Sequence, residues 1–404
     1  MAIETGRFKG GWDELVELLD LAFAAPWTDA QYETERKVWE ADRSIVAIDD
    51  GQLVGHTGAF SLRMAVPGAA RVPVAGVTMV GVRPTHRRRG ILRDLMREQL
   101  TEIHETGTEP LAALTASEPV IYGRFGYGFA SDVQEIVVPK AARGLRPVAG
   151  IDDVRIRYVD VRETLATCAA LRNRLAAERP GMFQHDERWH EYVIADNGTG
   201  DPASGSKRRC VLAERDGEVT GFAYYRTKRA EKGFVEVNRV HAVDVASHAA
   251  LWRYLLEPDL LSETRCEMLA SDDPLLDLLL DQRAPSPITR DGLWVRTVDV
   301  GRALAARTYG RDLDVVLAVT DNFLPWNAGT WHLTGGLDGA TCEPSTRTPD
   351  LTVDVRELGA VYLGKPSLAR LGRAGLVEEH TAGALAATSQ AFSTSRLPFL
   401  DTGF

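Results

Sequence analysis

Hydrophobic residues in this chain follow two alternating spacings, which predict strands and helices in turn. β-rich runs lie at residues 44–48, 53–60 and 77–82, and apolar residues then recur at helical spacing over residues 90–104. A similar succession of three runs and a helical pattern begins at residue 210. This order predicts an α/β fold in which helices pack against sheets.

The two successions share an Asp-Gly pair between their first two runs. Asp50-Gly51 and Asp216-Gly217 occupy the same place in each. Asp-Gly is favoured in tight hairpins, because both central residues of that turn need positive φ. We interpret the repetition as a duplicated α/β unit. Two unrelated hairpins are the alternative, since Asp-Gly turns are common.

Two stretches interrupt the periodicity and divide the chain. Residues 139–150 contain two prolines and two glycines, and residues 281–292 carry two prolines after a leucine-rich helical pattern. We therefore expect domains over residues 1–140, 150–288 and 289–404.

The third segment combines strand patterns, helical patterns and an apolar tail. Its strand patterns lie at residues 313–319, 330–333 and 351–355, and its helical patterns lie at residues 355–364 and 383–392. These predict an α+β domain. Chain ends usually fray, but the final stretch is apolar enough to predict docking, through Leu397, Phe399, Leu400 and Phe404.

Composition restricts what the chain can bind. Its 404 residues are 44% hydrophobic and 26% charged, as in an ordinary globular protein. The formal net charge of -10 argues against a nucleic-acid partner and favours a cationic small molecule. We expect a cytoplasmic protein with no membrane partner, because the sequence contains neither a signal peptide nor a long apolar run. The four cysteines lie far apart, so we expect buried thiols and no metal site.

The stretch "VRPTHRRRGILRDL", residues 82–95, places three arginines and a glycine at the start of the predicted helix. Unpaired amides and the helix dipole make such a start an anion site, and Gly90 allows a phosphate to approach the backbone. A solvated arginine run on a surface loop is the alternative reading. The strand before the arginines and the helix after them favour a pyrophosphate site. The second succession carries "DVASHAAL" here, without arginine or glycine, so we expect no such site there.

These residues resemble a known superfamily. "VGVRPTHRRRG", residues 80–90, is similar to motif A of the GNAT acyltransferases, although Leu92 departs from the pattern. "THRRRGIL", "ALTASE" at 113–118 and "IYGRFGYG" at 121–128 resemble the Eis (enhanced intracellular survival) family of aminoglycoside acetyltransferases. The resemblance continues through "DGLWVR" at 291–296 and "VYLG" at 361–364.

The resemblance implies an architecture and an activity. It implies two tandem GNAT-like domains, the second degenerate, followed by a sterol carrier protein-like α+β domain whose C-terminus reaches the active site. It implies an N-acetyltransferase that uses acetyl-CoA and no metal, acts on small cationic amines such as aminoglycosides by direct transfer, and assembles as a homohexamer. The alternative is a lipid-binding or scaffolding protein with a vestigial acetyltransferase unit.

The resemblance also implies roles for individual residues. Tyr122 would protonate the departing thiolate, with Tyr127 as the rival acid, and the α-carboxylate of Phe404 would be the general base. The backbone of Val80, Gly81 and Val82 would bind the pantetheine arm. The remaining donor-binding positions are Arg88, Arg89, Gly90, Ile91, Leu92 and Arg93 at the phosphates, and Ser117 and Glu118 on the loop after the next strand.

Three positions depart from the family on the acceptor side. Gly403 replaces an acidic residue, Thr115 replaces a pocket histidine, and Met79 replaces an aromatic residue on the strand that faces the substrate. These departures predict fewer fixed contacts to a polycationic aminoglycoside.

Overall fold

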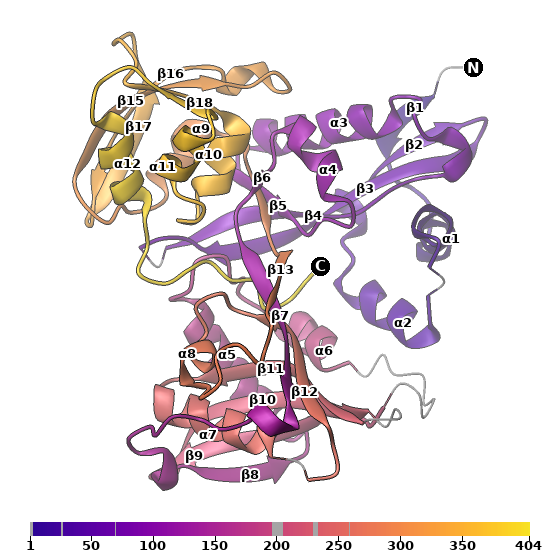
Figure 1. The fold of residues 1–404 in the computed structure, drawn as a ribbon. Helices are drawn as coiled ribbons and strands as arrows, with labels where there is room; N and C mark the ends of the chain where they lie inside the picture. The colour runs from indigo at the N-terminus through magenta and orange to yellow at the C-terminus, as the bar shows by residue number, and fades with distance from the viewer. Residues whose placement is uncertain (1–2, 26, 69, 196–204, 229–232, 258) are drawn as a thin grey trace. The chain divides into compact units, whose positions relative to one another are not determined.

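The computed structural model describes residues 3–25, 27–68, 70–195, 205–228, 233–257 and 259–404 (Figure 1). It forms two compact units, and each is built from separate stretches of the chain. The first unit contains residues up to 131, residues 177–184 and residues 291–404, and the second contains residues 132–176 and 185–290.

The first unit contains a seven-stranded sheet in the order β1-β2-β3-β4-β5-β14-β6. Its strands are β1 (Glu4–Arg7), β2 (Ile45–Asp49), β3 (Gln52–Ala65), β4 (Arg71–Val82), β5 (Leu111–Leu114), β6 (Gly128–Phe129) and β14 (Trp294–Thr297). The helices of this part are α1 (Trp12–Phe23), α2 (Asp29–Val38), α3 (Ile91–Thr106) and α4 (Pro119–Tyr122). α3 packs across β2, β3 and β4.

Helix α3 confirms the helical pattern predicted over residues 90–104. Its apolar positions face the sheet, and the buried ones are Ile91, Leu95, Met96, Leu100 and Ile103. Gly90 precedes the helix with a φ of 89°, and Gly107 ends it with a φ of 67°. Both conformations are left-handed, which favours glycine.

The first unit also contains the third sheet, in the order β17-β16-β15-β18-β19. Its strands are β15 (Leu313–Thr320), β16 (Gly329–Gly336), β17 (Gly339–Pro344), β18 (Leu351–Asp354) and β19 (Val377–Glu379). Its helices are α9 (Val300–Ala305), α10 (Val355–Val361), α11 (Leu368–Arg373) and α12 (Ala384–Phe392). The predicted strands at 313–319, 330–333 and 351–355 are confirmed, as are the two predicted helices.

The second unit has a seven-stranded sheet in the order β13-β7-β12-β11-β10-β9-β8. Its strands are β7 (Asp132–Pro139), β8 (Arg155–Val159), β9 (Arg209–Arg215), β10 (Glu218–Lys228), β11 (Phe234–Ala242), β12 (Glu263–Leu269) and β13 (Ile288–Asp291). Its helices are α5 (Leu165–Ala176), α6 (Glu187–Ile194), α7 (Val245–Leu256) and α8 (Pro274–Leu278). The sheet thus repeats the succession of hairpin, strand and helix that the sequence predicted.

Both Asp-Gly turns have the predicted backbone. Asp50 and Gly51 have φ values of 52° and 73°, and Asp216 and Gly217 have values of 53° and 82°. The turns join β2 to β3 and β9 to β10, which pair as antiparallel hairpins. The tight hairpin turn is therefore confirmed in each succession.

Two strands pair outside the stretch of sequence to which they belong. β7 lies within residues 1–140 but joins the second sheet, between β13 and β12. β14 follows the proline-containing boundary at residues 281–292, but it inserts between β5 and β6 of the first sheet. Each of these two sheets is therefore completed by a strand from beyond a predicted domain boundary, which we call strand exchange. No local pattern in the sequence indicates it. The domain boundaries at 140 and 288 stay predictions.

The four cysteines are free and buried, as predicted. Among the described residues, no helix combines the length and the apolar character needed to cross a membrane.

His56 is buried where β4 departs from regular pairing with β3. The register of the two strands shifts between His56 and Gly58, and Met79 of β4 has a φ of 52°. The His56 Nδ1–H donates a hydrogen bond of 2.7 Å to the carbonyl oxygen of Met79. Nε2 has no hydrogen-bond partner among the described residues. Burial lowers the pKa of His56 to about 4, so the ring is neutral in the folded protein.

This depressed pKa makes stability depend on pH in a defined direction. The unfolded chain binds a proton at His56 below about pH 6.5 and the folded protein does not, so stability is lost as pH falls from 6.5 toward 4. The loss at pH 4 is about 3 kcal/mol in the free energy of unfolding. We predict that His56→Met makes the free energy of unfolding depend less on pH between pH 4 and pH 6.5. Urea unfolding between pH 4 and pH 7.5 measures this profile. Exposed His380→Met is the control, and a His56→Met profile as steep as that of the control would contradict the prediction.

Candidate active site

A cleft of about 910 Å³ opens in the first unit beside the start of α3. This volume is sufficient for a cofactor-sized ligand. The described residues that line it are Ala22, Phe23, Val80, Gly81, Val82, His86, Arg87, Arg88, Gly90, Ile91, Leu92, Arg93, Ser117, Glu118, Ile121, Tyr122, Arg124, Phe125 and Phe323. The structure thus brings together nearly all of the predicted donor-binding residues and Tyr122.

The start of α3 presents amides and cations to this cleft. The first-turn amides of a helix have no intrahelical acceptor, and among the described residues no side chain caps them. The backbone turns into the left-handed region at Arg88, with a φ of 64°, and again at Gly90. Such turns make successive N–H groups converge on an anion. Arg88 and Arg93 line the same space, and the Arg93 guanidinium also pairs with the Asp94 carboxylate at 3.0 Å. The turned backbone and the two arginines together suit a diphosphate.

The neighbouring arginines have protein partners. Arg87 donates a hydrogen bond of 2.5 Å to the carbonyl oxygen of Ala22 at the end of α1. Arg89 pairs with Asp49 at 3.2 Å, and the described residues that line the cleft do not include it. The role of Arg89 in donor binding stays a prediction.

The edge of β4 supplies the other wall of the cleft. β4 pairs with β5 through Val74, Ala75 and Gly76. Beyond Gly76, no described strand occupies the β5 side of β4. The backbone groups of Val80 to Val82 on that side are therefore available to an extended ligand, as when a peptide adds to a sheet edge. This is the place where the pantetheine arm was expected.

Tyr122 ends the short helix α4, which follows the loop carrying Ser117 and Glu118. Its ring is 8% exposed and reaches the cleft. Burial, with a smaller contribution from Glu118, raises the pKa of Tyr122 to about 12, so the hydroxyl keeps its proton at neutral pH. Tyr127 is fully buried, and its hydroxyl has no hydrogen-bond partner among the described residues. Tyr122 is the better placed of the two tyrosines to reach a ligand.

The C-terminal tail docks on the first unit, as predicted. The Phe404 ring packs edge-on against Phe60 and Phe183, with centroid distances of 6.2 and 5.3 Å. Thr115, directly after β5, donates a hydrogen bond of 2.7 Å from Oγ1 to a terminal carboxylate oxygen of Phe404. Phe183 belongs to residues 177–184, which pair with the end of β3. The terminal carboxylate is thus held by a neutral donor at the end of the strand that leads to Tyr122.

Sequence reasoning missed several residues that line the cleft. Ala22 and Phe23 come from the end of α1, and Phe323 comes from the loop after β15. Phe323 lies more than 200 positions from the arginine stretch, and no local motif marks it. Arg124 and Phe125 lie two and three positions after Tyr122, so the motif "IYGRFGYG" could have indicated them.

Among the described residues of the second unit, the start of the corresponding helix is capped by a carboxylate. The counterpart of α3 is α7, and the Asp244 carboxylate before this helix accepts a hydrogen bond of 2.8 Å from the amide of Ser247. Asp244 also pairs with Arg215 at 2.7 Å. A carboxylate therefore occupies the place at this helix start that a phosphate would take.

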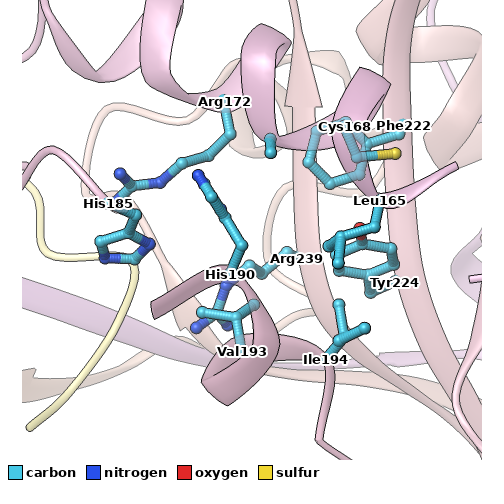
Figure 2. Close-up of a pocket in the computed structure, with 11 residues that line it drawn as sticks. Leu165, Cys168, Arg172, His185, His190, Val193, Ile194, Phe222, Tyr224 and Arg239 are labelled. Carbon is cyan, nitrogen blue, oxygen red and sulfur yellow. The ribbon is translucent and has the colours of Figure 1, made fainter. Parts of the chain in front are cut away.

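A small cavity in the second unit lies under α5 and α6 (Figure 2). Its volume of about 20 Å³ suits a water molecule and not a cofactor. His185 and His190 lie beside it, together with Arg172 and Cys168. Trp189 of α6 is buried. Among the described residues, no group of three or more histidine, cysteine or acidic side chains could hold a metal ion.

Family comparisons match this architecture. Residues 8–130 and residues 181–301 each match a family described as an acetyltransferase (GNAT) domain. Residues 300–401 match the sterol carrier protein domain family. The protein is therefore a tandem GNAT protein with a sterol carrier protein-like domain, which confirms the predicted fold class.

Similar proteins identify the family. An uncharacterized N-acetyltransferase of Streptomyces coelicolor is 44% identical over 403 residues, which cover 97% of each chain. N-acetyltransferase Eis of Mycobacterium bovis is 33% identical over 85% of this chain and 86% of that protein. The crystal structure of Eis1 from Mycobacterium abscessus matches over 100% of both chains, with a TM-score of 0.85 and 33% identity. The chain belongs to the Eis family of GNAT acetyltransferases, and it is an N-acetyltransferase.

The GNAT fold implies acetyl-CoA as the acetyl donor. The cleft fits this donor, because amides and guanidinium groups face the space at Gly90 and an unpaired strand edge continues from it. A lipid-binding or scaffolding protein with a vestigial acetyltransferase unit is not favoured, since relatives aligned over most of the chain are named N-acetyltransferases.

Gly90 offers a direct test of the anion site. We predict that Gly90→Ala weakens acetyl-CoA binding about tenfold or more, because a φ of 89° strains an alanine by about 1–2 kcal/mol and its Cβ would lie 3.2 Å from Arg93. Calorimetric titration measures the dissociation constant. Gly107→Ala is the matched control, since it strains the other end of the same helix at a φ of 67°. Equal affinity of the two variants for acetyl-CoA would contradict the assignment.

Proposed function

We propose that the protein transfers the acetyl group of acetyl-CoA directly to an amine of a small cationic acceptor, aminoglycoside-like in its chemistry. The observation that carries this proposal is the continuity of one cleft from the turned backbone at Gly90 to the hydroxyl-bearing ring of Tyr122. The donor supplies its acetyl group as a thioester. To transfer that group, the protein must position the amine against the thioester and supply one proton acceptor and one proton donor.

Tyr122 serves as the proton donor in this proposal. As the C–N bond forms and the C–S bond breaks, the sulfur takes the hydroxyl proton of Tyr122 and leaves as a thiol. The raised pKa keeps that proton in place throughout the physiological range. A thiolate is a much weaker base than an alkoxide or amide leaving group, so an acid as weak as a phenol is adequate.

The Phe404 carboxylate serves as the proton acceptor. An α-carboxylate has an ordinary pKa near 3.5, so it is charged at neutral pH and attracts an ammonium group. The ammonium first loses one proton to solvent, because only the neutral amine has the electron pair that attacks the carbonyl carbon. The nitrogen becomes far more acidic as the C–N bond forms, and the carboxylate then accepts its second proton. The Thr115 hydrogen bond orients the carboxylate for this step.

The acceptor side offers few fixed contacts to a polycationic acceptor. Met79 is 9% exposed, and Thr115 is engaged with the terminal carboxylate. A Cβ at Gly403 would meet no described atom within 4 Å, so there is room beside the tail but no acidic side chain at that position. The acidic net charge still favours cationic acceptors over neutral or anionic ones.

The activity and the role of Tyr122 as proton donor can be tested together by measuring thiol release from acetyl-CoA. The acceptors are a panel of monoamines, polyamines and aminoglycosides. We predict that Tyr122→Phe lowers kcat at least 100-fold with the best amine and leaves acetyl-CoA affinity within twofold. The wild-type rate should not fall from Tyr122 ionisation below pH 10, because its pKa is raised to about 12. Tyr127→Phe is the control and should keep nearly full turnover. Unchanged turnover in Tyr122→Phe, or no thiol release with any amine, would refute the proposal.

The terminal carboxylate has its own test. We predict that two glycines added after Phe404 lower kcat at least tenfold, because the carboxylate moves away from Thr115. Thr115→Val should also lower kcat, whereas Thr115→Ser should retain it, since serine keeps the hydroxyl. The same two glycines added at the N-terminus are the control. Full activity of the C-terminally extended protein would rule out the carboxylate as the base.

A further inference from the structure

Phe323 comes from the sterol carrier protein-like domain, yet it lines the donor cleft of the GNAT domain. It lies between α3 and the turn η3 (Gly123–Phe125), which follows α4. The Arg97 guanidinium of α3 stacks over the Phe323 ring at 4.7 Å and donates a hydrogen bond of 3.1 Å to the Phe323 carbonyl oxygen. The Phe125 ring lies 5.1 Å from that of Phe323. The ring is therefore held from two sides and is 8% exposed.

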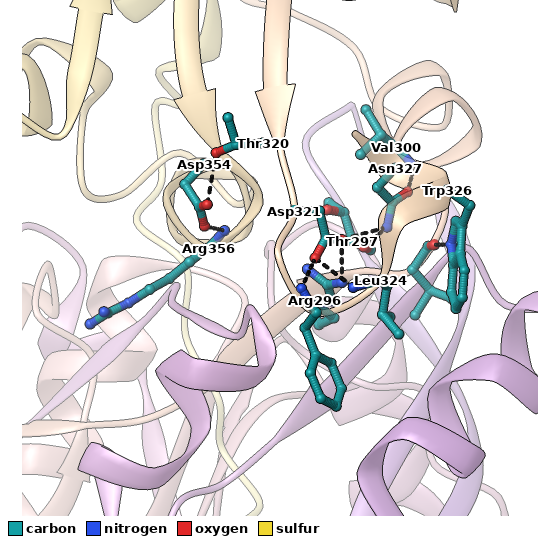
Figure 3. A network of polar contacts seen from close by, with 12 residues as sticks. Arg296, Thr297, Val300, Thr320, Asp321, Leu324, Trp326, Asn327, Asp354 and Arg356 are labelled. Atoms are coloured by element: carbon teal, nitrogen blue, oxygen red, sulfur yellow. Dashed lines mark hydrogen bonds and ion pairs between the residues drawn. The ribbon is translucent and has the colours of Figure 1, made fainter. Parts of the chain in front are cut away.

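Asp321 gives the loop that carries Phe323 its shape. Its Oδ1 accepts hydrogen bonds from the amides of Phe323, at 3.1 Å, and Leu324, at 2.9 Å. Its Oδ2 accepts a hydrogen bond of 3.1 Å from the Asn327 side chain (Figure 3). These bonds fix the backbone on both sides of Phe323.

Arg296 ties this loop to the first sheet. The guanidinium of Arg296, on β14, donates to Asp321 at 2.5 Å, and both side chains are fully buried (Figure 3). Among the described residues, Nε and Nη1 of Arg296 find no other acceptor, so Asp321 is the group that compensates its charge. A Cβ at Gly126 would overlap the Arg296 guanidinium, so the turn after Tyr122 packs directly against the pair.

We propose that Phe323 contacts the bound donor and is a donor-binding residue supplied by the third domain, with Asp321 and Arg296 as the residues that position it. The proposal rests on the proposed function, since it assumes that acetyl-CoA occupies this cleft. It gives the third domain a role in the cleft besides supplying the C-terminal carboxylate.

The physical basis is preorganisation. An aromatic ring that is already held by Arg97 and Phe125 loses little conformational freedom when a ligand covers its remaining face. The cleft is strongly cationic at Gly90, so Phe323 adds an apolar surface that can bury the uncharged parts of the donor. Such a contact strengthens donor binding equally before and during the reaction, so it acts on KM and not on kcat.

Phe323→Ala tests the contact. We expect acetyl-CoA to bind about tenfold more weakly by calorimetry, with its KM raised by the same factor and kcat within twofold. Trp326→Phe is the matched control, because Trp326 lies in the same loop and stacks on His104 at 4.3 Å but is absent from the described lining of the cleft. Wild-type affinity in Phe323→Ala would overturn the proposal.

A double-mutant cycle tests the positioning role of Asp321. We expect Asp321→Asn to weaken acetyl-CoA binding, and the double variant with Phe323→Ala to bind no more weakly than Phe323→Ala alone. Asp354→Asn is the control, since Asp354 bonds Thr320 and the amide of Arg356 (Figure 3) and is absent from the described lining of the cleft. Additive losses in the cycle would overturn the positioning role, and Phe323→Ala still tests the contact if Asp321→Asn fails to fold.

These results are distinguishable from failure of the proposed function. If the wild type does not bind acetyl-CoA at all, the proposed function fails. If the wild type binds acetyl-CoA and Gly90→Ala weakens that binding while Phe323→Ala does not, the role of Phe323 alone is refuted.

Discussion

The proposed activity depends on an electrostatic match between the start of α3 and a multiply charged anion. Amides without intrahelical acceptors, a backbone turned at Arg88 and Gly90, and guanidinium groups from Arg88 and Arg93 converge in one place. An anion bound here would offset the unfavourable interaction of these cations with the positive end of the helix dipole. The chain as a whole has the opposite sign, with a formal net charge of -10.

Distant parts of the chain meet in the first unit, which carries this site. β5 separates from β4 beyond Gly76 and leaves a strand edge beside the site, and the loop after β5 leads to Thr115 and then Tyr122. The tail returns almost 290 residues later to place the Phe404 carboxylate on Thr115. The buried pair of Arg296 and Asp321 holds the third domain where Phe323 meets the cleft. The third domain is thus part of the proposed active site and not an appended module.

Much of this could be predicted from local patterns. The apolar spacing of α3, the Asp-Gly turns and the apolar tail each follow from neighbouring residues, and the structure confirms all three. Non-local features were not predictable from one sequence. Strand exchange by β7 and β14, the approach of Phe323 and the pairing of Arg296 with Asp321 depend on segments far apart in the chain. The roles proposed for Tyr122 and Phe404 come from the family resemblance. The structure adds only where the two residues lie.

Calorimetric titration with two donors tests the central claim most directly. Acetyl-CoA carries the diphosphate, whereas S-acetylpantetheine keeps the thioester and pantetheine arm without it. Binding at the start of α3 predicts saturation at one acetyl-CoA per chain, weakened by added salt, and S-acetylpantetheine binding at least 100-fold more weakly. Equal affinity for the two donors, or no saturation with acetyl-CoA, would contradict it.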